Sequence, residues 1–356
     1  MLLLAVKKEG MKDPGALQPG DGTMPLPGNA VGGSGNIAGA LLAVILHEPS
    51  PKKMLLKPFR QLHRLLTSRT IVYGGPLMAS GTRLQQEHIL RLLLKGLHAR
   101  VKKRSLFTQF RNSFDLNDLR PVFRELDYDW QDRLNLLVDI TTEEKAWRGI
   151  TNNRRRQVKR SLENGATIIS QPSVKQVGAF YDLLREHYQR KVKKPLPGKG
   201  FFLALHHLSV TGGRQGKKDN DTGAIEVARY FLVARNDRII GGSVCVFKQG
   251  RTMHEWYACG LDHEYKKHRV YPSVLSNWAA IEFAANNNIP AFDFMGMGRP
   301  EVPYGVRDFK KEFGGRLKNP GRFNKVNRRF LYALAEIGYN MSFLFKFINR
   351  PKQKTR

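Results

Sequence analysis

Apolar and polar residues follow two rhythms along the chain, which predict strands and helices. Short apolar runs such as Arg69–Tyr73 and Leu134–Ile140 are typical of buried strands, whereas apolar residues three and four positions apart, as in Gln85–Leu97, predict one-sided helices. The other expected strands are Met1–Val6, Ala40–His47, Leu106–Phe110, Ala166–Ser170, Ala228–Arg235, Arg238–Phe247, Thr252–Leu261 and Ala291–Met295. The other expected helices are Lys57–Thr67, Leu116–Leu126, Glu143–Asn164, Val174–Arg190, Phe201–Leu208, Tyr271–Ala285 and Arg328–Ile348.

These elements occur in one order twice: strand, helix, helix, antiparallel strands, helix and strand. The economical interpretation is an α+β protein with two similar domains, each a mixed, mostly antiparallel sheet flanked by helices. We expect one domain over residues 1–165, joined by the C-terminal segment 316–356, and a second over residues 166–315. The Gly- and Pro-rich stretch before Gly39 and the polar segment Arg214–Gly223 are expected to be loops.

Composition agrees with a globular protein and adds a strong charge. The 356 residues are enough for two domains, and the apolar share of 41% excludes a disordered or collagen-like chain. Lys and Arg number 60 against 30 Asp and Glu, for a net charge of +30. Such an excess favours a polyanionic partner, which the charge alone leaves open among nucleic acid, an anionic membrane surface and a phosphorylated substrate.

The two cysteines, Cys245 and Cys259, fit no metal or redox spacing, and we expect both to be buried among apolar residues. We therefore expect no metal and no cofactor. The apolar run Met1–Val6 is too short for a signal peptide, and Ile37–Leu46 is about half a membrane span. These features predict a cytoplasmic protein, with peripheral contact at the inner face of the membrane as an option.

The order of strands and helices in the second half is similar to that of the N-acetyltransferase (GNAT) fold. In such enzymes a glycine-containing turn before a helix holds the pyrophosphate of coenzyme A with backbone N–H groups. The matching turn here is Arg269–Val274 (RVYPSV), in which Pro272 stands at a glycine position and has no N–H to donate. The turn therefore predicts no coenzyme A cradle, and it is equally typical of a plain helix start.

Two nearby motifs carry a more specific resemblance. Phe292–Gly298 (FDFMGMG) and Tyr304–Gly315 (YGVRDFKKEFGG) are similar to the signature of the Fem family, which includes FemA, FemB and FemX. Glu255–Tyr257 resembles the family's hairpin and Thr151–Gly165 its basic helix. The resemblance implies two tandem GNAT-like domains that move an aminoacyl group from aminoacyl-tRNA to an amine on the stem peptide of a peptidoglycan precursor, UDP- or lipid-linked.

The resemblance also implies where the chemistry occurs. When an amine attacks an ester, the oxyanion of the tetrahedral intermediate needs positive charge, and the family's Phe-Lys pair maps onto Phe309 and Lys310. In so basic a chain, a solvated lysine is the ordinary alternative, and Lys311 is a competitor.

Proton removal is open among four side chains. Asp293, Asp308, Glu255 and Tyr304 are candidates for the base, although each is of a type that more often has a structural role. A proton transfer assisted by the substrate itself would need none of them.

A further group of residues is expected to bind substrate. Arginine binds phosphate bidentately, and closely spaced glycines allow backbone to approach a ligand. The candidates are Arg155, Lys159, Arg269 and Arg307 for phosphates, Gly296 and Gly298 for a substrate-lined turn, and Trp256, Tyr257 and Tyr304 as aromatic contacts. The two glycines are equally typical of a plain turn. For Arg155 and Lys159 an exposed, solvated helix face is the alternative.

The basic C-terminal segment admits three roles: contact with an anionic membrane, contact with tRNA phosphates, or a helix docked on the first domain. Two other functions also compete with aminoacyl transfer. One is an N-acyltransferase that uses acyl-CoA or acyl carrier protein on an envelope or small-molecule amine. The other is a non-catalytic nucleic-acid-binding protein, although no helix-turn-helix or zinc motif is present. The oligomeric state is not predictable from the sequence.

Overall fold

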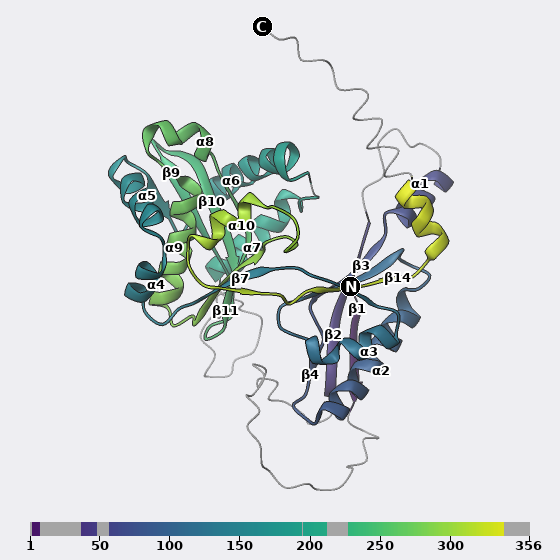
Figure 1. Cartoon of the computed structure of the whole chain (residues 1–356). Helices are drawn as coiled ribbons and strands as arrows, with labels where there is room; N and C mark the ends of the chain where they lie inside the picture. Colours follow the sequence, from purple (N-terminus) through teal and green to yellow (C-terminus); the bar gives the residue numbers. More distant parts are fainter. Residues whose placement is uncertain (1, 8–36, 48–56, 194, 212–226, 338–356) are drawn as a thin grey trace, which may run out of the picture. The chain divides into compact units, whose positions relative to one another are not determined.

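The computed structural model describes residues 2–7, 37–47, 57–193, 195–211 and 227–337. The expected loops before Gly39 and at Arg214–Gly223 lie largely or wholly outside these residues, as does the expected C-terminal helix beyond Ile337. Two compact units divide the chain, and their elements are labelled in Figure 1. Unit 1 comprises residues 1–132 and 319–356, and unit 2 comprises residues 133–318.

The described part of unit 1 is built on a seven-stranded sheet in the order β1-β2-β3-β5-β14-β6, with β4 paired to β2. Three strands are antiparallel, and β5 then lies parallel to β3 after the crossover helix α2. The strands are β1 (Leu2–Lys7), β2 (Ile37–Leu46), β3 (Arg69–Gly74), β4 (Leu77–Met78), β5 (Phe107–Asn112), β6 (Asp129–Gln131) and β14 (Arg322–Val326). The helices are α1 (Lys57–Leu66), α2 (Arg83–Val101), the 3-10 turn η1 (Asn117–Leu119) and α3 (Arg120–Glu125).

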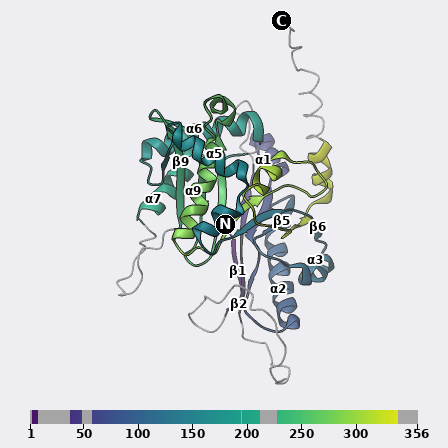
Figure 2. The same cartoon turned by 60° about the vertical axis from the view of Figure 1, so that its left-hand side comes forward.

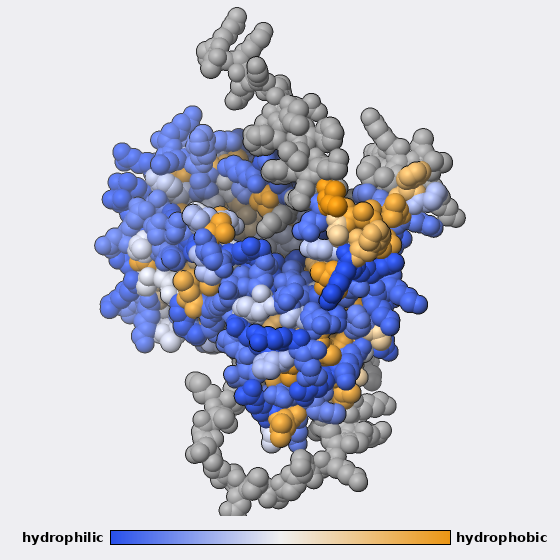
Figure 3. Space-filling model, turned by 45° about the vertical axis from the view of Figure 1, so that its right-hand side comes forward, coloured by the Kyte–Doolittle hydropathy of each residue, from blue (hydrophilic) through white to orange (hydrophobic). Residues whose placement is uncertain are grey.

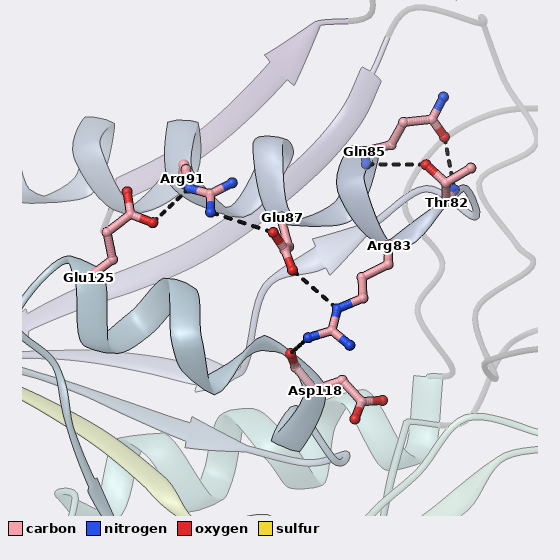
Figure 4. Close-up of polar contacts among 7 residues, drawn as sticks. All are labelled: Thr82, Arg83, Gln85, Glu87, Arg91, Asp118 and Glu125. Atoms are coloured by element: carbon pink, nitrogen blue, oxygen red, sulfur yellow. Dashed lines mark hydrogen bonds and ion pairs between the residues drawn. The ribbon is translucent and has the colours of Figure 1, made fainter. Parts of the chain in front are cut away.

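Helix α2 buries its apolar stripe against this sheet, as its periodicity predicts. A capping box begins it: the Thr82 hydroxyl accepts from Gln85 N, and the Gln85 side chain accepts from Thr82 N. On the polar side, Arg91 reaches Glu125 of α3 at 2.9 Å, and further contacts run through Glu87 (Figure 4). Unit 1 therefore has its own hydrophobic core, and an ion pair connects its helices α2 and α3.

Unit 2 contains a second seven-stranded sheet among its described residues, in the order β13-β7-β12-β11-β10-β9-β8. Again three antiparallel strands, β9 to β11, are followed by a parallel partner, β12, after a crossover helix, α9. The strands are β7 (Asn135–Asp139), β8 (Thr167–Ile169), β9 (Ala228–Arg235), β10 (Arg238–Val246), β11 (Thr252–Gly260), β12 (Ala291–Gly296) and β13 (Arg316–Lys318). The helices are α4 (Glu143–Gly149), α5 (Asn152–Glu163), α6 (Val174–His187), the π-helical turn η2 (Tyr188–Val192), α7 (Lys199–Thr211), α8 (Asp262–Tyr265), the 3-10 turn η3 (Lys266–His268), α9 (Pro272–Asn286) and α10 (Gly305–Lys311).

The sheet of unit 2 is apolar on both faces because helices cover both. Phe231 and Val233 of β9 join the core under α9, whereas Tyr230 and Leu232 point to the core under α6 and α7. Helix α9 lies along β9 and β10 (Figure 2). Cys245 and Cys259 are buried within these cores, as predicted, and burial raises the pKa of both thiols. The two sheets give the α+β architecture that was expected.

Two expectations differ from the structure. The helix expected over Glu143–Asn164 is two helices, because α4 ends at Gly149 and Thr151 starts a new N-cap whose hydroxyl accepts from Arg154 N. The expected domain boundary at residue 165 also differs from the observed division. Strand β7 pairs with β12 and α5 packs on α9, so residues 133–165 lie in unit 2.

Candidate active site

A gap between two neighbouring strands marks the centre of unit 2. Strands β11 and β12 pair only from Thr252 to His254, opposite residues 291–293, and each strand is irregular just beyond that point. The pairing of β11 with β10 shifts register near Trp256, and the pairing of β12 with β7 shifts between Asp293 and Gly296. Such irregularities bend strands and re-aim side chains. In unit 1 the corresponding strands, β3 and β5, pair along their whole length.

Lys310 of α10 reaches this gap from the C-terminal motif. Its ammonium donates to the carbonyl of Phe294, and its Nζ lies 3.3 Å from Glu255 Oε2. Both side chains are largely shielded from water, at 12% exposed for Lys310 and 4% for Glu255. Because little water reaches this ammonium, the local dielectric constant is low, and the ammonium interacts with a neighbouring charge more strongly than a solvated lysine does.

Glu255 is the acidic partner in the gap. Burial raises the pKa of its carboxyl, an effect that Lys310 opposes and that the nearby Asp293 carboxyl adds to. One oxygen faces Lys310, and the other, Oε1, is buried without a hydrogen-bond partner among the described residues. A buried acceptor of this kind can take a hydrogen bond or a proton from an incoming group.

Asp293 lies beside this pair but is engaged by its own surroundings. Its Oδ1 accepts from Met295 N at 2.6 Å, and its Oδ2 accepts from the amide of Asn135 at 3.1 Å. The imidazole of His254 is 3.6 Å from the same Oδ2. The first bond supports Met295, which has a positive φ of 55°, so Asp293 stabilises the irregular stretch of β12 between Asp293 and Gly296.

Helix α10 is fixed in place by α5. The guanidinium of Arg154 lies over the ring of Phe309 at 4.3 Å and donates to Glu312 at 3.1 Å. The backbone of Thr151 also donates to the carbonyl of Glu312 at 2.9 Å. Phe309 therefore serves as the platform for a buried cation, and this anchoring sets the position of its neighbour, Lys310.

Arg307 holds the loop that precedes α10. Its guanidinium donates to the carbonyls of Met297, Arg299, Pro300 and Val302. Gly298 has a positive φ of 78°, and a β-carbon there would lie 3.2 Å from the Tyr304 ring, so a glycine fits this turn best. These contacts give Arg307, Gly298 and Tyr304 a defined role in shaping the loop.

The other expected binding residues are spread over unit 2. Arg155 donates to the carbonyls of Trp147, Arg148 and Ile150 and so caps the C-terminus of α4. Lys159 borders an open hollow of about 380 Å³ on the basic face of α5. Asp308 and Arg269 have exposed side chains, and Gly296 pairs with Asn135 at the end of β12.

The N-terminus of α9, where a GNAT fold would hold pyrophosphate, is occupied by the protein's own carboxylate. Asp262 accepts from Ser273 N at 3.2 Å and from Ser273 Oγ at 2.5 Å. Tyr271 N donates to the hydroxyl of Ser161, and Pro272 has no N–H. Burial raises the pKa of Asp262, although its hydrogen bonds with Ser273 and the charge of Arg154 oppose the shift.

Aromatic side chains border the gap on the side of α7. Trp256 is 44% exposed, and its ring is nearly parallel to that of Phe201, with 6.3 Å between centroids and 10° between planes. Tyr257 packs against Phe202 at 5.0 Å and lies 6.3 Å from Tyr188. The two aromatic residues expected from the hairpin thus adjoin Glu255 along β11.

The start of the basic C-terminal segment is helical at residues 329–337. Tyr332 packs edge-on against Phe107 of β5, whereas Phe330, Leu334 and Ile337 are exposed. Figure 3 shows such apolar groups as patches on a mainly hydrophilic surface. No helix among the described residues is long and apolar enough to span a membrane, and those residues hold no cluster of side chains suited to a metal ion.

Sequence reasoning missed several residues of this site, among them Arg154, Glu312 and Asp262. Arg154 shares a buried helical stripe with Val158 and Ser161, so the spacing of the stripe could have separated it from its exposed neighbours. Glu312 carries no local signal because its partner, Arg154, is 158 positions earlier, whereas Asp262 bonds with Ser273 only 11 positions later, across the turn before α9.

Comparison with known proteins agrees with this architecture. Residues 215–340 match the FemAB family. The solved structure of FemX is similar over 86% of this chain and 89% of its own, with a TM-score of 0.57 and 13% identity, a likeness that concerns the fold. The C-terminal domain of a putative lysylphosphatidylglycerol synthetase from Agrobacterium fabrum matches over 84% of each chain with 10% identity and a TM-score of 0.47. No curated protein sequence matches the chain.

The fold of two tandem GNAT-like units and the FemAB match of residues 215–340 support a transferase. Within that class, the stretch that carries the Lys310 motif is similar to the FemAB family, whose match spans residues 215–340.

Proposed function

We propose that this transferase moves an aminoacyl group from aminoacyl-tRNA to an amine on the stem peptide of a peptidoglycan precursor. The observation that carries the proposal is the dry Lys310–Glu255 pair at the strand gap, within a Fem-family motif. The match of residues 215–340 to the FemAB family supports the reaction class, and the site supplies groups that this reaction requires.

In the proposed reaction the neutral amine attacks the ester carbonyl of the donor. A C–N bond forms, the carbonyl oxygen becomes an oxyanion, and the C–O bond to the ribose then breaks. Lys310 supplies positive charge to the oxyanion, and it does so in a site from which water is largely excluded. The proton lost by the amine finally resides on the ribose hydroxyl. Glu255 Oε1, which has no hydrogen-bond partner among the described residues and belongs to the carboxyl that pairs with Lys310, is an acceptor that could carry it.

The filled N-terminus of α9 favours a charged tRNA over acyl-CoA as the donor. A pyrophosphate at that helix end would have to displace Asp262 from Ser273 and would find no donor at Pro272. Two negative groups competing for one helix N-terminus repel each other. An aminoacyl ester on tRNA does not need this cradle.

The net charge of +30 agrees with two polyanionic substrates. Basic surfaces such as that of α5 attract phosphates. Both the tRNA backbone and the pyrophosphate of a UDP- or lipid-linked precursor supply them. We place the reaction on the cytoplasmic side of the membrane, because charged tRNA is found there.

The test is a transfer assay with a radiolabelled aminoacyl group. The protein is incubated with a UDP-linked stem-peptide precursor and either charged tRNA or the matching acyl-CoA. We expect transfer from charged tRNA alone, abolished by ribonuclease. Transfer from acyl-CoA, or tight RNA binding with no transfer from either donor, would contradict the proposal.

A further inference from the structure

The exposed rings of Trp256 and Phe201 lie next to the proposed reaction centre. Trp256 directly follows Glu255 in β11, so their Cα atoms are about 3.8 Å apart. One side chain faces Lys310 in the gap, whereas the other is 44% exposed to solvent. Phe201 at the start of α7 is 37% exposed and extends the same aromatic surface.

We propose that Trp256, supported by Phe201, is the stacking platform for the terminal nucleobase of the donor's single-stranded 3′ end. This inference rests on the proposed function. RNA-binding proteins recognise unstacked single-stranded ends by stacking bases on aromatic side chains. The two rings are nearly parallel with an offset of 6.3 Å between centroids, so a base stacked on the exposed Trp256 ring would extend this aromatic surface.

The short distance between Trp256 and the Lys310–Glu255 pair indicates which group stacks on Trp256. In an aminoacyl-tRNA the terminal base and the reacting ester are attached to one ribose, so a base stacked beside Glu255 places the ester carbonyl near Lys310. In acyl-CoA a long arm separates the adenine from the thioester. In a peptidoglycan precursor the stem peptide separates the reacting amine from the sugar and the nucleotide. A flat platform one residue from the gap therefore fits the donor's own nucleoside.

Positive charge adjoins the platform on the side of α6. The turn η2 begins at Tyr188, whose ring lies 6.3 Å from that of Tyr257; it includes Lys191, and Lys193 follows it as the C-cap. Both lysines are exposed. Aromatic platforms combined with a basic track are the usual means of binding a single strand, in which the rings hold bases and the cations follow the phosphates.

The test compares the affinity for two forms of one tRNA: an intact 3′ end and an end that lacks the terminal adenosine. Wild type should bind the intact form more tightly, by about 5- to 150-fold, which is the range expected for stacking one base. Trp256→Ala should lose this preference while its affinity for the shortened tRNA is unchanged. Trp256→Phe should retain most of the preference, and Phe201→Ala should reduce it. Phe330→Ala, which removes an exposed ring of unit 1, is the matched control and should keep it.

The possible results are distinct. An unchanged preference in folded Trp256→Ala, with transfer from charged tRNA intact, would overturn the platform and leave the proposed function standing. A raised KM for the precursor with an unchanged tRNA preference would overturn it too, in favour of sugar stacking. If wild type transfers nothing from charged tRNA, the proposed function fails and takes this inference with it. Circular dichroism melting verifies that each variant is folded.

Discussion

Replacing Lys310 by methionine should separate stability from activity at the strand gap. Without the ammonium, Glu255 keeps a buried carboxylate that has lost its partner, and one of its oxygens is already without a hydrogen bond. Breaking one side of a buried ion pair costs about 3–5 kcal/mol of unfolding free energy. Removal of an oxyanion-stabilising group lowers kcat by about 100- to 1000-fold.

The second substitution, Glu255→Gln in the Lys310→Met background, removes the stranded charge. Since a neutral pair is often as stable as a buried ion pair, the double variant should regain most of the lost unfolding free energy. It should not regain transfer. Urea unfolding gives the free energies, and single-turnover transfer from charged tRNA gives the rates. Lys311→Met is the control, because Lys311 is exposed on the same helix.

The stability deficit of Lys310→Met should depend on pH in a defined direction. Burial already raises the pKa of Glu255 above its ordinary 4.5, and loss of Lys310 raises it further. A carboxyl with a raised folded pKa contributes stability that is present below pH 4.5 and lost as the pH rises through the folded pKa. The deficit of Lys310→Met should therefore be largest at neutral pH and shrink in acid. Equal stability and equal transfer in Lys310→Met and Lys311→Met would refute this account of the site.

Three further predictions concern groups around the gap. Asp262→Asn should raise the unfolding free energy at neutral pH and lose that advantage in acid, because burial raises the Asp262 pKa above 3.8; an advantage independent of pH would contradict the cause. Arg154→Lys keeps the charge but loses the planar contact with Phe309, so α10 should be misplaced and kcat should fall by about 10- to 100-fold. Steady-state kinetics measure kcat and KM, and a change in KM alone would contradict this role of Arg154. Thr82→Ala should cost unit 1 about 1 kcal/mol through its lost cap, whereas Thr82→Ser should not; urea unfolding measures both, and transfer should be unaffected.

Local patterns predicted the framework of the fold. The apolar runs that predicted β9, β10 and β11 and the periodicity that predicted α2 and α9 describe elements whose burial is set by their own residues. The pattern failed where a short polar signal interrupts a helix, as at Gly149 and Thr151. It also missed β13 and β14. These strands are short, and their hydrogen bonds are made with β7 and β5, which are far away in the sequence.

The site was predictable to a smaller extent. The Fem-like motif pointed to Lys310, and the structure places that lysine beside Glu255, which is 55 positions earlier in the chain. Which of several acidic residues would lie there could not follow from spacing, since a register shift in β11 decides it. Arg307 and Arg155 were expected as phosphate ligands because arginine suits that role, but in the structure their donors are engaged by backbone carbonyls.

The continuous pairing of β3 with β5 in unit 1 has an evolutionary consequence. Two strands without a gap leave no place between them for a shielded lysine, so β3 and β5 do not carry the register shifts found in β11 and β12. Substitutions that a population tolerates should accumulate faster along β3 and β5 than along β11 and β12, although the two pairs of strands have the same place in the architecture.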